Sequence, residues 1–251
     1  SFNVYWDAIN LLIKSLKLGS VRPFYILGYS LGGFLALGCQ IKNRLESNTG
    51  FLNPSLTICI APMMGLPISP IISSITRLCN FLLKYLNLSN IGIPYSLASL
   101  VSMMGFAGKN IKVSVSKASQ FWENKENIKY YGKEKSIESL SHFQHNNKLD
   151  TEGPSWNWVS NAILECELLL NSKELRKLPC SILMVLADNE YVTDPKVQKK
   201  AVNLFKNIEV LNLPSCRHDI FQEKDEVQQL FWKGIDQFID KNKSKFETAL
   251  S

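Results

Sequence analysis

The segment from Gly28 to Gly32 reads Gly-Tyr-Ser-Leu-Gly, the residue types of a serine nucleophile held in a sharp turn. The apolar residues before it, Phe24 to Leu27, are aromatic or branched and predict a buried strand. The residues after it, Gly33 to Leu45, have apolar side chains at helical spacing. A strand, a tight turn and a helix are the context in which this motif exposes a serine hydroxyl. We therefore predict that Ser30 is a catalytic nucleophile.

The turn itself explains the two glycines and predicts a group that stabilises negative charge. We expect Gly28 and Gly32 to face each other across the turn without room for a Cβ atom. The helix after the turn directs its first backbone N–H groups toward the place where an oxyanion would form. The N–H of Leu31 is the first of these, so we predict that Leu31 is an oxyanion-hole donor.

A nucleophilic serine needs a histidine base, and the histidine needs a carboxylate to orient it. His142 and His145 lie in a polar stretch and are interpreted as exposed side chains. His218 follows the predicted strand Ile208–Leu213 by a short loop. In a parallel sheet this is the carboxyl end, where active sites gather. We predict that His218 is the base.

The acid is expected between the serine and the histidine in chain order, after the predicted strand Ser181–Ala187. Three carboxylates crowd that loop, Asp188, Glu190 and Asp194. Asp188 directly follows the strand, whereas Glu190 lies deeper in the loop. Position alone leaves all three open.

These residues lie among elements that alternate between strand and helix, which predicts a parallel sheet covered by helices on both faces. The alternation stops between residues 63 and 178, where helical spacing dominates. We therefore divide the chain into two core segments, 1–62 and 179–251, with a mainly helical cap, 63–178, inserted between them. The predicted strands are 24–27, 56–61, 181–187 and 208–213, and the predicted helices are 1–18, 33–45, 68–88, 156–170, 195–205 and 227–241.

With these features the chain resembles the α/β-hydrolase superfamily, and more narrowly the bacterial lysophospholipases of the monoacylglycerol-lipase-like group. The resemblance rests on the turn at Gly28–Gly32 and on three further segments: Ser1–Asp7, Gly153–Trp158 and His218–Asp225. It implies an α/β-hydrolase fold with an inserted cap.

The resemblance also selects an acid. In this group the acid is the third residue after the small residue that ends the strand, and a valine soon follows. Applied to Ala187–Val192, this implies Glu190, with Asp188 as the alternative acid. The group often has aspartate here, so the glutamate is a departure from its pattern.

The function implied by the resemblance is a serine ester hydrolase acting on lipid esters with one acyl chain, either lysophospholipids or monoacylglycerols. Tyr29, Trp156 and Trp158 are predicted to contact the substrate, although the two tryptophans could instead pack the cap. The apolar helix at 68–88 has the same two interpretations, cap core or contact with acyl chains and membrane. A proline-releasing serine peptidase and an inactive hydrolase-fold fragment that only binds lipid or a partner protein are the alternatives.

The composition of the chain limits which kinds of partner and cofactor we expect it to bind. A formal net charge of +6 without a basic stripe argues against nucleic-acid binding. The 6 cysteines form no C-x-x-C pair and no spacing with histidine that suggests zinc. The serine-hydrolase interpretation implies no metal and no organic cofactor. No apolar run is long enough to span a membrane. We expect a cytoplasmic protein, with peripheral contact to a membrane surface as a further hypothesis; the sequence does not indicate an oligomeric state.

No strand is predicted before Phe24, whereas in this fold the strand that carries the nucleophile is central. The N-terminal strands of the fold, and the loop that gives the second oxyanion donor, are therefore expected to be missing. By this interpretation residues 1–251 are a C-terminal fragment. Expressed alone, such a fragment is expected to be insoluble or molten, and essentially inactive.

Overall fold

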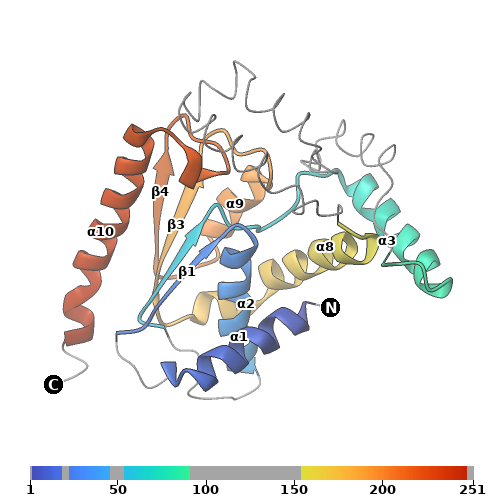
Figure 1. Ribbon diagram of the computed structural model, residues 1–251, viewed down its shortest axis with the longest axis horizontal. Coiled ribbons are helices and arrows are strands. Elements are labelled where there is room, and N and C mark those ends of the chain that lie inside the picture. The colour runs from blue at the N-terminus through green and yellow to red at the C-terminus, as the bar shows by residue number, and fades with distance from the viewer. Residues whose placement is uncertain (1, 19–22, 46–53, 91–153, 248–251) are drawn as a thin grey trace, which may run out of the picture.

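Among the residues that the structure describes, four parallel strands form one sheet in the order β1-β2-β3-β4, and their carboxyl ends lie along one edge (Figure 1). The computed structural model describes residues 2–18, 23–45, 54–90 and 154–247. The register aligns Tyr29 with Ile60, and Ile60 with Val185. The α/β fold expected from the sequence is confirmed, and each predicted strand is present. The strands are β1 (Tyr25–Tyr29), β2 (Leu56–Ile60), β3 (Ser181–Ala187) and β4 (Ile208–Leu213).

Helices cover both faces of this sheet, as a buried parallel sheet requires. On one face, Phe34 and Leu37 pack with Met184 of β3. On the other face, Phe231 packs with Ile60 and with neighbouring strand residues. The first face is covered by α1 (Asn3–Ser15), α2 (Leu31–Leu45), α8 (Trp156–Asn171) and α9 (Pro195–Val202), and the second by α10 (Asp225–Glu247). Figure 1 shows the helix of the second face, α10, on the side of the sheet opposite α1, α2 and α8.

Burial differs between the inner and the outer strands. Every residue of β2 is buried, and β3 is buried from Ile182 to Ala187. The two outer strands are buried only in part, and Leu27 in the middle of β1 is 49% exposed. Within the described residues β1 pairs with β2 alone, so its other edge is unpaired there.

The described parts of the predicted cap are α3 (Pro70–Tyr85) and α8, which pack against each other. Arg77 of α3 forms an ion pair with Glu167 of α8. The hydroxyl of Ser155 accepts the N–H of Trp158 at 3.1 Å, so this serine caps the start of α8. Residues 91–153, including His142 and His145, lie outside the described residues, so the boundaries of core and cap stay a prediction.

One face of α3 carries large apolar side chains that the described residues leave exposed. They lie at helical spacing, so they form a single stripe along the helix. Both interpretations of this helix, cap core and contact with acyl chains or membrane, therefore stay predictions. Among the described helices, none combines the length and apolar character needed to cross a membrane. The stripe consists of Ile71, Ile75, Leu78, Phe81, Leu82 and Tyr85.

The turn between β1 and α2 depends on one glycine more than on the other. A Cβ atom at Gly28 would lie 2.3 Å from the carbonyl oxygen of Gly32, a distance that no real structure accommodates. A Cβ atom at Gly32 would meet no atom within 4 Å, so the prediction for Gly32 was wrong. Because α2 begins directly at Leu31, it is the backbone of Gly32 that approaches Gly28. The second crowded position is Gly33, where a Cβ atom would lie 2.9 Å from the Cβ of Pro62.

These two glycines form a matched pair of test positions. Gly28→Ala should lower the free energy of unfolding by about 3 kcal/mol or more, because the new methyl group meets backbone that cannot move aside. Gly32→Ala should change it by less than about 1 kcal/mol, and in the stabilising direction, because alanine suits a helix better than glycine. Chemical denaturation of the two variants and the wild type measures both effects. Equal losses in the two variants would contradict this description of the turn.

Candidate active site

Ser30 lies directly after β1 in a left-handed backbone conformation, with φ of 53°. This conformation is strained for a residue other than glycine and persists only where the surroundings enforce it. Two hydrogen bonds do so here: the Ser30 N–H donates to the carbonyl of Ile60 at 2.8 Å, and the Ser30 carbonyl accepts the N–H of Met63 at 3.0 Å. The end of β2 therefore holds the serine at the carboxyl edge of the sheet.

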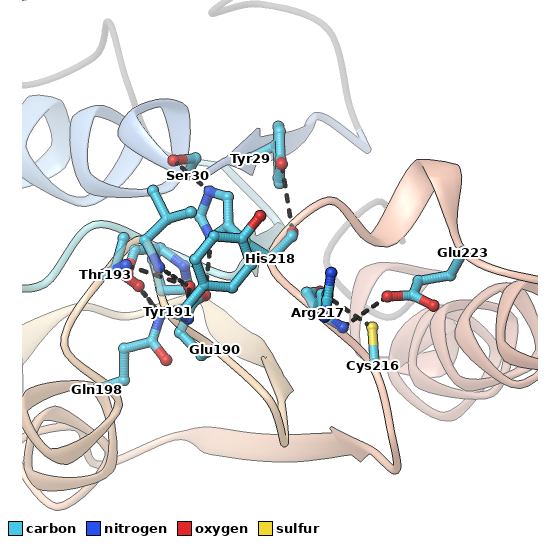
Figure 2. Close-up of polar contacts among 12 residues, drawn as sticks. Tyr29, Ser30, Glu190, Tyr191, Thr193, Gln198, Cys216, Arg217, His218 and Glu223 are labelled. Carbon is cyan, nitrogen blue, oxygen red and sulfur yellow. Dashed lines mark hydrogen bonds and ion pairs between the residues drawn. The ribbon is translucent and has the colours of Figure 1, made fainter. Parts of the chain in front are cut away.

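His218 reaches Ser30 from the loop after β4, and both of its ring nitrogens have partners (Figure 2). The Nε2 atom lies 2.9 Å from the Oγ of Ser30. The Nδ1 atom lies 2.7 Å from Oε2 of Glu190. His218 is 7% exposed and Glu190 is also buried, so their contact is shielded from water, whereas Ser30 is partly exposed.

Glu190 lies in the loop after β3, and the loop curls around its carboxylate. Oε1 accepts three backbone N–H groups, from Tyr191 at 2.9 Å, Val192 at 2.8 Å and Thr193 at 3.1 Å. Burial alone would raise the pKa of Glu190, but the hydrogen bond and charge of His218 and the backbone N–H groups outweigh it, so the pKa lies below its usual value. The carboxylate is therefore ionised at neutral pH.

The ionisation of Glu190 determines how the protons are arranged. An ionised carboxylate only accepts hydrogen bonds, so Nδ1 of His218 carries the ring proton and donates it to Glu190. Nε2 is then left with a lone pair that accepts the hydroxyl proton of Ser30. This arrangement can remove a proton from the serine as the serine attacks an electrophile.

The other two carboxylates of this loop have different positions. The side chain of Asp188 is exposed, and its backbone N–H donates to the carbonyl of Leu213. Asp194 caps α9, where its Oδ1 accepts the N–H groups of Lys196 at 2.8 Å and Val197 at 3.2 Å. The structure thus brings Glu190 to His218 and gives Asp194 a structural task.

The other residues predicted for the site are the oxyanion-hole donor and the three substrate contacts. The N–H of Leu31 opens α2 directly beside Ser30. The hydroxyl of Tyr29 donates to the carbonyl of His218 at 3.2 Å. Trp156 is buried, and Trp158 packs against Phe2 with ring centroids 6.0 Å apart. Substrate contact by Tyr29 and the two tryptophans stays a prediction.

Two supporting residues were missed by the sequence reasoning. Gln198 of α9 is buried and donates to the carbonyl of Pro62 at 2.9 Å and to the hydroxyl of Thr193 at 2.8 Å. Glu223 accepts the N–H of Arg217, the residue before His218, at 2.6 Å (Figure 2). Glu223 belongs to a segment that carried the family resemblance, but its spacing gives no sign of this contact. Gln198 has no distinguishing signal, because its partner Pro62 is distant in sequence.

The comparisons with known proteins agree with this architecture. The family model described as "Serine aminopeptidase, S33" matches residues 1–225. A probable lysophospholipase L2 of Haemophilus influenzae is 26% identical over 95 residues, which are 38% of this chain and 30% of that protein. This chain therefore aligns with less than a third of that relative's length.

Two solved structures share the fold. A monoacylglycerol lipase of Paleococcus ferrophilus superposes with a TM-score of 0.57 at 12% identity, covering 96% of this chain and 76% of that one. A thermostable carboxyl esterase of Bacillus coagulans superposes with a TM-score of 0.60 at 16% identity, covering 93% of this chain and 69% of that one. At such low identity the likeness establishes the fold alone.

The electrostatics of Glu190 predict a pH dependence of stability. The pKa of this carboxyl is lower in the folded chain than the value of about 4.3 in an unfolded one. Its ionisation therefore stabilises the fold above that pH, and this contribution is lost as the pH falls through the folded pKa. The difference in the free energy of unfolding between wild type and Glu190→Gln should be largest near about pH 6 and shrink toward about pH 3.

Chemical denaturation at a series of pH values measures this difference. Asp188→Asn is the matched control, because its exposed side chain should give a small difference at every pH. A difference for Glu190→Gln that stays constant across the range would show that the carboxylate is not held in its ionised form.

Proposed function

The chain belongs to the serine aminopeptidase S33 family of α/β-hydrolases, and we propose that it is a serine ester hydrolase acting on lipid esters with a single acyl chain. Lysophospholipids and monoacylglycerols are the proposed substrates. The observation that carries the proposal is the hydrogen-bonded line from Ser30 through His218 to Glu190, with distances of 2.9 and 2.7 Å. Glu190, rather than Asp188, is the proposed acid.

The proposed reaction proceeds in two halves. In the first, Oγ of Ser30 attacks the ester carbonyl while Nε2 of His218 takes the hydroxyl proton, and the histidine then protonates the departing alcohol. An acyl group remains on Ser30. In the second, His218 takes a proton from water, the resulting hydroxide attacks the acyl carbonyl, and the proton returns to Ser30 as the fatty acid leaves.

Two further groups stabilise the charges that form. Glu190 holds the imidazole in the required tautomer and offsets the positive charge that His218 acquires. The N–H of Leu31 donates to the oxyanion of the tetrahedral intermediate. One such donor typically contributes about 10²–10³ in turnover.

The names of the relatives support the substrate class. The curated relative is a probable lysophospholipase, and one of the structures with this fold is a monoacylglycerol lipase. The family description names an aminopeptidase, so a proline-releasing peptidase is the second candidate. We also propose a cytoplasmic protein that meets its lipid substrate at a membrane surface, and the exposed apolar stripe of α3 supports this.

The role of Ser30 is tested by covalent labelling. Ser30→Ala in the full-length natural protein should abolish labelling by a fluorophosphonate probe, because the probe reacts with a serine activated by histidine. Ser74→Ala, which changes an exposed serine of α3, should label like the wild type. Labelling that persists in Ser30→Ala would identify a different nucleophile, and a wild-type protein that is never labelled would favour the inactive alternative.

The substrate class is tested by kinetics. The full-length protein should hydrolyse a lysophospholipid or a monoacylglycerol with a kcat/KM about 10-fold or more above that for a two-chain phospholipid or a proline dipeptide amide. This preference follows from the substrate class proposed here, a lipid ester with one acyl chain. A clear preference for the dipeptide amide would overturn the lipid assignment in favour of the peptidase.

A further inference from the structure

The strand order places Ser30 and His218 at distant strand ends, so the loop after β4, which carries His218, has to cross the edge of the sheet. Ser30 follows β1 and His218 follows β4, the two outermost of the four strands in the described part of the chain. Neighbouring strands lie about 4.8 Å apart, so these two strand ends are separated by about 14 Å. The Nε2 of His218 is nevertheless 2.9 Å from the Oγ of Ser30. The loop after β4 must therefore extend across the ends of β3 and β2 and be held there.

Contacts near β3 and α10 fix the first part of this loop. The N–H of Asn189 donates to the carbonyl of Cys216 at 2.8 Å. Glu223, which is 1% exposed, accepts the N–H of Arg217 at 2.6 Å. Both contacts hold the residues that directly precede His218, Cys216 and Arg217. The N–H of Ile220 also donates to the His218 carbonyl, at 2.9 Å. None of these three contacts comes from β1.

Tyr29 acts on His218 from β1. Its hydroxyl donates to the main-chain carbonyl of His218 at 3.2 Å. Its ring lies beside the imidazole, with centroids 5.3 Å apart and planes at 37°. The Tyr29 ring also contacts the ring of Phe221, with centroids 5.3 Å apart and planes at 84°. Figure 2 shows Tyr29 and Ser30 both reaching the same histidine, one at its carbonyl and the other at its ring.

We propose that Tyr29 is a positioning residue for the reaction proposed above, and that it places His218 over Ser30 through the His218 carbonyl and ring. Tyr29 and Ser30 are adjacent in the chain, so the end of β1 contacts His218 at two points. The Tyr29 contact fixes the backbone of His218, and at the Ser30 contact Nε2 of His218 accepts the hydroxyl proton. This inference concerns the site of the proposed function and rests on it.

The protonation of Tyr29 is consistent with this task. Burial raises the pKa of the Tyr29 phenol well above its ordinary value, and the nearby carboxylates of Asp219 and Glu190 raise it further. The phenol therefore remains protonated, and a hydrogen-bond donor, at neutral pH. A permanent donor is what a fixed tie to a carbonyl requires.

The experiment compares three variants in the full-length natural protein. Tyr29→Phe keeps the ring and loses the hydrogen bond, so kcat for a monoacylglycerol should fall about 10-fold with KM within about 2-fold. Tyr29→Leu also loses the ring contact and should lower kcat further, to about 100-fold below wild type. Tyr25→Phe, at the other end of β1, is the matched control and should leave kcat unchanged.

A second measurement does not depend on turnover. The Nδ1–H proton of His218, bonded to Glu190, should give a downfield NMR resonance, and the chain has only 3 histidines to distinguish. Tyr29→Phe should shift or broaden this resonance, whereas Tyr25→Phe should leave it unchanged.

The two measurements separate the possible failures. An unchanged kcat together with an unchanged resonance in Tyr29→Phe would overturn the positioning role. A rise in KM with kcat unchanged would also overturn it, because that result is expected of a substrate contact. A protein that hydrolyses none of the esters but still shows the resonance change would reject the proposed function and keep the role of Tyr29.

Discussion

The hydrogen bond between Glu190 and His218 is the interaction on which the rest of the site depends. A buried carboxylate is costly unless hydrogen bonds replace its water, and Glu190 meets this condition with His218 on one oxygen and three backbone N–H groups on the other. Those N–H groups converge only if the loop curls at Thr193, where Gln198 ties it to Pro62. The serine, the acid loop and the end of β2 are therefore stabilised together, and none of them is placed independently.

Strained backbone conformations cluster at the carboxyl ends of the strands, where the chain turns sharply into the loops of the site. Three residues other than glycine with left-handed backbone lie just beyond strand ends: Ser30 at φ 53°, Ala61 at φ 41° and Ser215 at φ 54°. Each lets the chain leave its strand at a sharp angle, so that the loops after β1, β2 and β4 converge. Such conformations persist only where packing enforces them, and the buried β2 and β3 supply that packing. Strain at the site thus depends on the rigidity of the layer beneath it.

Much of this could be predicted from the sequence because it depends on local patterns. Apolar runs gave the strands, and the positions of Ser30 and His218 beyond strand ends gave two members of the site. The acid required more, because Asp188, Glu190 and Asp194 occupy one loop and differ only in burial and in hydrogen bonds. Asp194 could have been set aside, since an aspartate before Pro195 is typical of a helix cap. The role of Gln198 could not, because it depends on a contact with Pro62, which is distant in the sequence. The open space at Gly32 could not either, because it depends on the exact path of the backbone through the turn.

The glutamate at position 190 also has a physical explanation. Its two carboxylate oxygens have different partners: Oε1 accepts the backbone N–H groups of the loop, and Oε2 accepts the Nδ1–H of His218. An aspartate is shorter by one carbon–carbon bond of about 1.5 Å, so it could keep both sets of contacts only if the acid loop or the histidine loop moved by a comparable distance. The acid loop is tied to β2 by Gln198, and the histidine loop to β1 by Tyr29. With both loops fixed, the longer side chain spans the gap that these two ties leave.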